Sequence, residues 1–396
     1  MKTLYSVLLS ITCLSTFGQL QKPTQNGNIF TFQNKNVVME IDKSYGGRIK
    51  SVKINSIEFL YQNCDFASAY TTCGSTLWPS PESSWGYPPP QTLDHYAYTG
   101  GIKDNSVFLR SGSDPTLKIA FSKTFSADAA DTSFTMVYTI KNPGASSVSF
   151  ACREVTRVFS SGGLFFFPAD ANAVGDSKGN PNSLSNLFSY SLGNAWFKQK
   201  NSDPSKQKVF SDGKGGWMAY IDKDRRLIVK KFQDLTASQF APNEKEIEFW
   251  YSDKDNYYEL ENESKYAVIK ASDSTSWTMK WYLRQLPVGI NANVGDQKLL
   301  DYVNHVVNGW INTSVPEDES VQLSFSPNPA NSEIVIRSAY TNSRVEVSIK
   351  DLNGREVAHF AAINGQHLPL SLANGIYICT LNSGKQKYSN KLVISK

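Results

Sequence analysis

Several kinds of side chain and motif that chemistry often depends on are scarce or missing in this chain of 396 residues. It has four histidines, five cysteines and five methionines, and charged residues make up only 19% of it. Lysine and arginine exceed aspartate and glutamate by four, without basic runs, which argues against a nucleic-acid groove. No P-loop, GxGxxG, HExxH or CxxC motif is present, so we predict no cofactor.

Metal and nucleophile motifs are equally weak. Asp170, Asp176 and Asn180 could ligate calcium, but they lack the spacing of an EF-hand, and we predict no metal site. One GxSxG match occurs at Gly175–Gly179, where a nucleophile elbow would need a preceding strand and a following helix. Asn180-Pro181-Asn182 follows it, which predicts a polar loop.

Long apolar runs are absent except at the N-terminus. Lys2 precedes the apolar stretch from Leu4 to Phe17, and Gly18 follows, which predicts a signal peptide over residues 1–18. No later stretch approaches the length of a membrane span, so we expect no transmembrane segment. Export would allow a disulfide between Cys64 and Cys73, although the spacing alone does not prove it.

Period-two patterns dominate the rest of the chain and predict strands. Phe134, Met136, Tyr138 and Ile140 share one face of a strand, and a second such face contains Trp277, Met279, Trp281 and Leu283. The one convincing helical pattern runs from Asp296 to Val307. We therefore predict an all-β fold, with a large antiparallel sandwich over residues 24–311. A polar linker at 312–320 would join it to a C-terminal domain at 321–396.

The C-terminal segment contains four short blocks in a fixed order: Ser326–Asn331, Ile349–Arg355, Leu372–Tyr377 and Lys391–Ile394. Together they resemble the C-terminal sorting domain of type IX secretion substrates. The resemblance implies a small β-sandwich that addresses the protein to the secretion machinery, through the periplasm and outer membrane. It also implies a secreted or cell-surface protein, whose function resides upstream.

The upstream domain resembles the galactose mutarotase superfamily, or aldose 1-epimerase-like supersandwich. The resemblance rests on Val38–Val52 with its Gly46-Gly47 pair, on Tyr138–Asn142 leading to Arg153–Arg157, and on Tyr258–Asn262. It implies that Glu261 occupies the position of the family's catalytic glutamate. The strand where the family has its catalytic histidine contains Arg153, Glu154 and Arg157 instead. The segment Gly74–Pro90 resembles an exported branch of the superfamily whose role is mostly unassigned.

Candidate site residues fall on two strands. Alternation places Tyr257, Glu259, Glu261 and Glu263 on one face of a strand, where residues two apart lie about 6.5 to 7 Å from each other. A face with three carboxylates cannot be dry core, so it is either exposed or lines a site. A glutamate there could act as a general base once burial raises its pKa.

The arginine strand supplies further candidates. Arg153 and Arg157 share a face, with Glu154 on the opposite one, unless a bulge intervenes. Paired guanidinium groups suit a carboxylate or sulfate ligand. The alternative interpretation is that the arginines form intramolecular pairs with surface carboxylates.

The proline-rich loop within Gly74–Pro90 offers binding candidates. Its aromatic residues Trp78, Trp85 and Tyr87 are irregularly spaced, so they are less easily explained as one face of a strand and could instead stack on sugar rings. His95 follows this loop and is the better histidine candidate for catalysis, although a lone histidine is often structural. We predict that substrate contacts come from Trp78, Glu82, Trp85, Tyr87, Tyr96, Tyr257 and Glu259, and catalysis from His95, Arg153, Glu154, Arg157 and Glu261.

Three functions remain open. The leading hypothesis is a carbon–oxygen lyase that acts on uronic-acid-containing poly- or oligosaccharides in external polysaccharide degradation. Glu261 or His95 would take the C5 proton, Arg153 or Arg157 would hold the carboxylate, and Tyr96 or Tyr257 would assist the leaving oxygen. The lyase would either cleave the chain by β-elimination or remove water from a terminal uronic acid. The alternatives are a noncatalytic glycan-binding protein and an aldose 1-epimerase, with a hydrolase as a more remote one.

Overall fold

The computed structural model describes residues 22–65, 67, 71–128, 131–199, 207–251, 256–308, 323–338, 344–351, 354–383 and 386–396. The chain divides into two compact units, Met1–Trp310 and Ile311–Lys396. The signal peptide predicted over 1–18 and the linker predicted over 312–320 lie outside the described residues.

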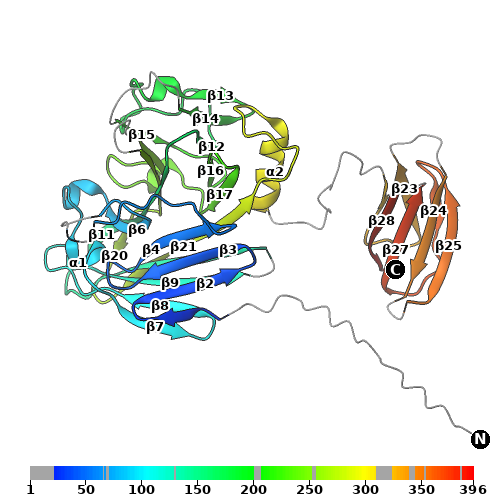
Figure 1. Ribbon diagram of the computed structural model, residues 1–396, viewed down its shortest axis with the longest axis horizontal. Coiled ribbons are helices and arrows are strands. Elements are labelled where there is room, and N and C mark those ends of the chain that lie inside the picture. Colours follow the sequence, from blue (N-terminus) through cyan, green and yellow to red (C-terminus); the bar gives the residue numbers. More distant parts are fainter. Residues whose placement is uncertain are drawn as a thin grey trace, which may run out of the picture. The chain divides into compact units, whose positions relative to one another are not determined.

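Two antiparallel sheets build the first unit (Figure 1). The first sheet has the order β1 (Thr24–Asn26), β2 (Ile29–Asn34), β3 (Val37–Asp42), β4 (Arg48–Ile54), β6 (Ser75–Ser80), β11 (Val148–Phe159), β19 (Tyr257–Glu263), β18 (Ile247–Tyr251) and β15 (Gln207–Ser211). β5 (Ile57–Glu58) pairs with β4, and β20 (Ala267–Ile269) pairs with β11.

The second sheet packs against the first. Its order is β13 (Ser189–Ser191), β14 (Asn194–Lys198), β12 (Leu164–Pro168), β16 (Trp217–Ile221), β17 (Arg226–Lys231), β21 (Ser274–Gln285), β10 (Ser133–Lys141), β9 (Ala120–Asp128), β8 (Ser106–Arg110) and β7 (Thr99–Lys103). The predicted period-two faces on β10 and β21 are both buried in the core between the sheets, because alternate side chains of a strand point to the same side. These sheets confirm the prediction of an all-β antiparallel sandwich.

Helices are few and short among the described residues. α2 (Gln297–Asn308) matches the helix predicted from Asp296 to Val307, and its buried Leu299, Leu300 and Val303 pack with Phe166 and Trp217 on the outer side of the second sheet. The other helical turns are η1 (Glu82–Ser84), α1 (Gln91–Asp94), η2 (Ser185–Leu187) and η3 (Ala237–Gln239). No helix in the described part of the chain is long and apolar enough to span a membrane. The GxSxG match lies in a loop, as predicted.

The second unit is a small β-sandwich, as predicted. One sheet has the order β22 (Leu323–Ser326), β23 (Glu333–Ser338) and β26 (His367–Pro369), and the other has the order β25 (Glu356–Ala362), β24 (Val345–Lys350), β27 (Gly375–Ser383) and β28 (Gln386–Ile394). Its own apolar core includes Ile334, Val347 and Leu381. This unit therefore has a core separate from that of the first unit.

Candidate functional site

The outward face of the first sheet carries a row of charged side chains. Across the β11–β19 pair, Arg153 lies opposite Glu263, and Arg157 lies opposite Glu259. The alternate β19 residues Tyr258 and Leu260 are buried in the core between the sheets. The charged row therefore points away from the second sheet, on the face that alternation predicted.

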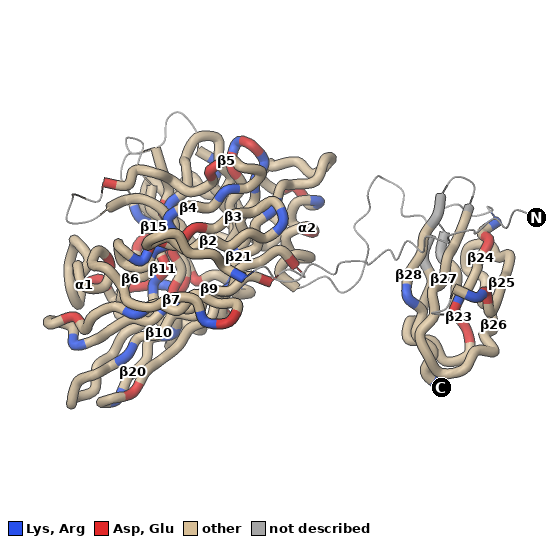
Figure 2. The backbone as a smooth tube through the Cα atoms, turned by 60° about the horizontal axis from the view of Figure 1, so that its bottom comes forward, with Lys and Arg blue, Asp and Glu red and all other residues tan. Residues whose placement is uncertain are grey.

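Two further strands extend this face. On β18, Glu248 lies opposite Glu261 and Trp250 lies opposite Glu259. On β15, Lys208 lies opposite Trp250. Because β6, β11, β19, β18 and β15 are neighbours in the sheet, residues far apart in sequence converge here, and Figure 2 shows acidic and basic positions gathered around β6, β11 and β15.

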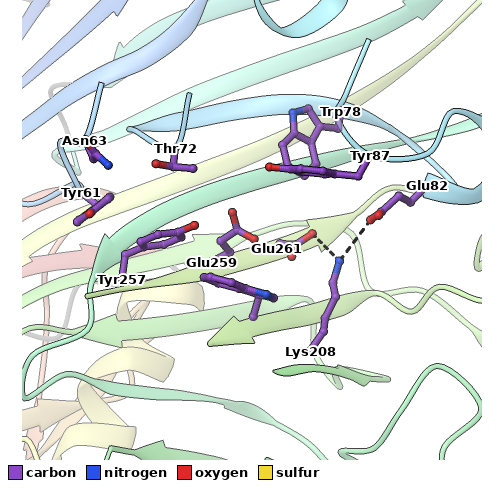
Figure 3. A pocket seen from close by; sticks show the side chains of 11 residues that line it. Tyr61, Asn63, Thr72, Trp78, Glu82, Tyr87, Lys208, Tyr257, Glu259 and Glu261 are labelled. Carbon is purple, nitrogen blue, oxygen red and sulfur yellow. Dashed lines mark hydrogen bonds and ion pairs between the residues drawn. The ribbon is translucent and has the colours of Figure 1, made fainter. Parts of the chain in front are cut away.

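A cavity of about 530 Å³ opens on this face, and we call it the cleft. It is lined by Tyr61, Asn63, Thr72, Trp78, Glu82, Tyr87, Lys208, Trp250, Tyr257, Glu259 and Glu261 (Figure 3). Its size lies within the range of small-molecule sites, and aromatic faces beside a few polar groups are typical of them.

Aromatic rings form walls on two sides of the carboxylates (Figure 3). Tyr61 stacks on Tyr257 with 4.7 Å between ring centroids, and Trp250 lies 5.0 Å from Tyr257. Trp78 and Tyr87 lie together at the other side. These rings offer flat apolar area of the kind that stacks on sugar rings.

The loop that follows β5 completes the cleft and is closed by a disulfide between Cys64 and Cys73. The sequence allowed this bond without proving it. Asn63 and Thr72, which line the cleft, are each adjacent in sequence to one of these cysteines. The bond therefore restrains this part of the wall.

The indole ring of Trp78 is fixed by contacts with Asp94 and Trp85. Its indole Nε1 donates to Oδ1 of Asp94 at 2.9 Å, and the ring of Trp85 packs edge-on against it at 5.8 Å. Burial disfavours the Asp94 carboxylate, but the Arg48 guanidinium and the hydrogen bonds from Thr76 and Trp78 outweigh it, so the pKa of Asp94 lies below its ordinary value. Trp85 thus supports the wall and is not among the lining residues.

Lys208 lies between the carboxylates of the cleft. Its ammonium is 3.2 Å from Oε2 of Glu261, 2.5 Å from Oε2 of Glu248 and 4.0 Å from Oε2 of Glu82. Burial raises the pKa of Glu261 above its ordinary value, although Lys208 acts in the opposite direction. Glu261 can therefore hold a proton more readily than an exposed glutamate.

Glu259 has a different partner. Nε and Nη2 of Arg157 both lie 2.8 Å from its Oε1. Burial again raises the pKa of Glu259, against the effect of Arg157. The guanidinium of Arg157 is 2% exposed and lies 5.4 Å from the ring centroid of Trp78, beneath the cleft surface.

Arg153 is enclosed by carboxylates. Its guanidinium lies 2.7 Å from Glu263, 2.7 Å from Glu244, 3.3 Å from Glu248, 3.3 Å from Glu82 and 3.8 Å from Glu261. Burial alone would lower the pKa of Arg153, but these carboxylates raise it well above its ordinary value. The side chain is fully buried, so this guanidinium does not face a ligand in the cleft.

One acidic cluster brings three carboxylates close together. Oxygens of Glu244, Glu248 and Glu263 lie within 4.8 Å of one another. Arg153 contacts all three carboxylates, so a cation of the chain already offsets part of their charge.

Six of the predicted site residues converge on the cleft: Trp78, Glu82, Tyr87, Tyr257, Glu259 and Glu261. The two arginines lie behind it and pair with carboxylates of the chain itself, as the alternative interpretation expected, although most of these carboxylates are buried and not on the surface. Their role in holding a substrate carboxylate stays a prediction, and the pairing in this structure does not favour it.

Glu154 points to the opposite side of the sheet, as alternation predicted. Its carboxylate accepts from Tyr138 Oη at 2.8 Å and lies 2.9 Å from Nζ of Lys230, both on the second sheet. Glu154 is fully buried between the sheets, so it does not reach the cleft.

His95 and Tyr96 follow α1 and are not among the lining residues. The His95 ring lies 5.6 Å from the ring of Tyr45 in an edge contact, and Tyr96 is 53% exposed. Neither is placed for the catalytic or substrate contact that the sequence suggested.

The sequence reasoning missed several lining residues: Tyr61, Asn63, Thr72, Lys208 and Trp250. Alternation within Ile247–Tyr251 would have placed Glu248 and Trp250 on one face, which was an available signal. Nothing local in the sequence marks Lys208 or Tyr61 as cleft residues.

Comparisons with known proteins identify the C-terminal unit. Residues 324–395 match the family described as the secretion system C-terminal sorting domain. The protein is therefore exported through type IX secretion, to the cell surface or beyond it. No curated protein matches the chain.

Solved structures similar to the chain include a protein from Synechocystis sp. PCC 6803, with a TM-score of 0.49, 14% identity, and coverage of 72% of this chain and 100% of that one. A galactose mutarotase-like protein from Lactobacillus casei ATCC 334 has a TM-score of 0.45, 11% identity, and coverage of 65% and 100%. A galactose mutarotase related enzyme from Lactobacillus acidophilus has a TM-score of 0.45, 9% identity, and coverage of 65% and 97%.

Proposed function

We propose that the cleft binds a saccharide and that Glu261 transfers a proton to or from the bound sugar. The observation that carries the proposal is the pairing of buried carboxyl groups with aromatic walls in one cavity. Aromatic faces supply stacking area for a sugar ring, and carboxylates accept hydrogen bonds from its hydroxyls. Export past the outer membrane fits a substrate outside the cell.

Glu261 has the properties that general acid–base catalysis needs. It lines the cleft, and burial raises its pKa toward the range in which a carboxyl group can both give and take a proton. The Lys208 ammonium at 3.2 Å orients the carboxylate and offsets its charge. Glu82 lies on the same cleft, 39% exposed, and can act as the second carboxyl of an acid–base pair.

The charges around the cleft favour a sugar without a carboxylate. Glu82, Glu259 and Glu261 line it, against Lys208 as the one lining cation. Both candidate arginines are engaged by carboxylates of the chain. A uronate would add a negative charge beside these carboxylates. Its repulsion would weaken binding unless one of the paired cations left its own carboxylate and bound the uronate instead.

Elimination on a uronic acid is the second candidate function, and Lys208 is the observation that favours it. Its ammonium is 23% exposed and lines the cleft, so it is the group that could meet a substrate carboxylate. Glu261 would take the C5 proton, the electron pair would form the C4–C5 double bond, and the C4–oxygen bond would break. The leaving oxygen would take up a proton, and Tyr257 lies within the cleft to donate it.

The test combines binding and turnover on one panel of neutral and acidic oligosaccharides. Calorimetry measures binding, carbohydrate analysis measures changed products, and ultraviolet absorbance detects the unsaturated uronate that elimination forms. We expect binding of at least one sugar, with turnover lost in Glu261→Gln and binding of uncharged sugars retained.

Three outcomes separate the candidates. Turnover with formation of an unsaturated uronate selects elimination. Binding without any turnover selects a noncatalytic glycan-binding protein, and absence of binding across the panel refutes a saccharide cleft.

A further inference from the structure

The carboxylates around the cleft outnumber the cations that meet them. Among the described residues of this ion-pair network, the carboxylates are Glu82, Glu244, Glu248, Glu259, Glu261 and Glu263, and the cations are Arg153, Arg157 and Lys208. Buried carboxylates are stable only when paired or protonated. The network therefore has capacity for further positive charge.

One oxygen of a cleft-lining glutamate has no hydrogen-bond partner in the described part of the chain. Oε1 of Glu261 is buried and has no hydrogen-bond partner among the described residues, while its Oε2 faces Lys208. A buried oxygen without a donor is unfavourable, so the Glu261 carboxyl group has unused hydrogen-bonding capacity.

Lys208 shows how the cleft holds a primary ammonium group. Its Nζ lies between the carboxylates of Glu248 and Glu261, and Figure 3 shows it reaching toward Glu261 and Glu82. The same carboxylate row continues to Glu259, whose two contacts from Arg157 go to Oε1. A second ammonium group would therefore find carboxylate oxygens of the same kind further along the row.

The aromatic walls also favour a bound cation. A cation above the face of tryptophan or tyrosine is attracted by the ring quadrupole, and more strongly when it is desolvated. Trp78, Trp250 and Tyr257 present such rings in the cleft, and the guanidinium of Arg157 already lies 5.4 Å from the ring centroid of Trp78. Burial raises the pKa of Glu259 and Glu261, and an incoming cation would act in the opposite direction, because a nearby positive charge favours the ionised carboxylate.

We infer that the cleft selects an amino sugar whose protonated amine binds the carboxylates of Glu259 and Glu261 while its ring stacks on the aromatic walls. The inference rests on the proposed function and names the substrate class of the same site. A free amine such as methylammonium shares the charge but has no ring to stack. An N-acetylated sugar keeps the ring and loses the charge.

The experiment compares matched ligands on the unaltered protein by calorimetry at neutral pH. The ligands are glucosamine oligomers, the corresponding N-acetylglucosamine and glucose oligomers, a glucuronate oligomer and methylammonium. We expect the amine series to bind at least tenfold more tightly than the acetylated and neutral series, since a tenfold change is about 1.4 kcal/mol and one charge-assisted contact is worth at least that. Added salt should reduce this difference, because screening weakens charge–charge attraction.

Variants test the residues named. Glu259→Gln and Glu261→Gln should each reduce the preference for the amine over the neutral sugar, while Glu333→Gln in the second unit should leave it unchanged. The ligand comparison on unaltered protein decides the question even where a variant fails to fold. Equal binding of amine and neutral sugars overturns the inference and leaves the proposed function standing.

Two further outcomes distinguish failure of the amino-sugar inference from failure of the proposed function. Methylammonium that binds as tightly as the amino sugar would show a free-amine site and overturn the inference. Binding by none of the sugars would overturn the proposed function as well.

Discussion

Removal of the Arg153 guanidinium tests whether this residue stabilises the fold or binds substrate. Arg153→Met would leave Glu244, Glu248 and Glu263 without the cation that contacts all three. Loss of one partner from a buried ion pair costs about 3–5 kcal/mol, because the remaining charge stays buried and uncompensated. We expect a loss of unfolding free energy of about that size, reduced where the carboxyl groups take up protons.

The pH dependence of this loss has a definite sign. Burial already raises the pKa of Glu248 and Glu263 in the folded protein, and the Arg153 charge opposes that rise. Without Arg153 the folded protein binds more protons than the unfolded chain above the ordinary glutamate pKa of about 4.3. The unfolding free energy of the variant should therefore decrease as pH rises, and its deficit should be larger at pH 8 than at pH 5.

Denaturant unfolding of the variant and the unaltered protein at both pH values provides the measurement. Arg110→Met is the matched control, because Arg110 is exposed on β8 and should cost less than about 0.5 kcal/mol. A deficit for Arg153→Met equal to that of the control, or one that is larger at pH 5, would refute the reasoning. Unchanged stability with lost saccharide binding would return Arg153 to the role that the sequence suggested.

Three further changes have definite expected outcomes. Burial raises the pKa of Glu246 from 4.5 to about 9, so the unfolding free energy should fall by about 1.4 kcal/mol per pH unit for this proton across that window. Glu246→Gln should flatten this slope in melts at several pH values. Trp250→Ala should weaken saccharide binding by about 1 kcal/mol in calorimetry, through loss of stacking area. Replacing both Cys64 and Cys73 with serine should lower the unfolding free energy by about 2–3 kcal/mol for the nine-residue separation, and intact stability in denaturant would contradict the chain-entropy estimate.

The sequence predicted the strands and the helix correctly because the spacing of apolar residues within each segment determines which face is buried. Period-two alternation places Met136 and Tyr138 in the core, and helical spacing places Leu299 and Val303 against the second sheet. The same alternation correctly placed Glu259 and Glu261 on one face of β19. Fold class and strand faces could therefore be read from neighbouring residues alone.

The ion-pair partners of the arginines could not be predicted in this way, because they depend on which strands are neighbours in the sheet. Arg153 meets Glu244 and Glu248 because β19 and β18 follow β11 in the sheet, although about ninety residues separate them in sequence. The sequence therefore left two interpretations of the arginines open, and the long-range pairing selects the intramolecular one. Lys208 was missed for the same reason, since β15 joins the sheet only through β18.

Proximity in sequence also misled the choice of His95. It follows the proline-rich loop that supplies Trp78 and Tyr87, but α1 turns it toward Tyr45. Asp94, its neighbour, is the residue of this segment that acts on the site, through its hydrogen bond from Trp78. A residue beside a binding loop can thus support the wall without facing the ligand.

The three glutamates on one face of β19 differ in their partners and in their exposure. Glu263 is 1% exposed and bound by Arg153, so its carboxylate is committed to the interior network. Glu261 is equally buried, yet one oxygen faces Lys208 and the other has no partner among the described residues. Glu259 is 12% exposed and has its arginine behind it. Because the three share residue type and strand, only their neighbours distinguish them, and Glu261 is the one whose carboxyl group has an oxygen without a hydrogen-bond partner among the described residues.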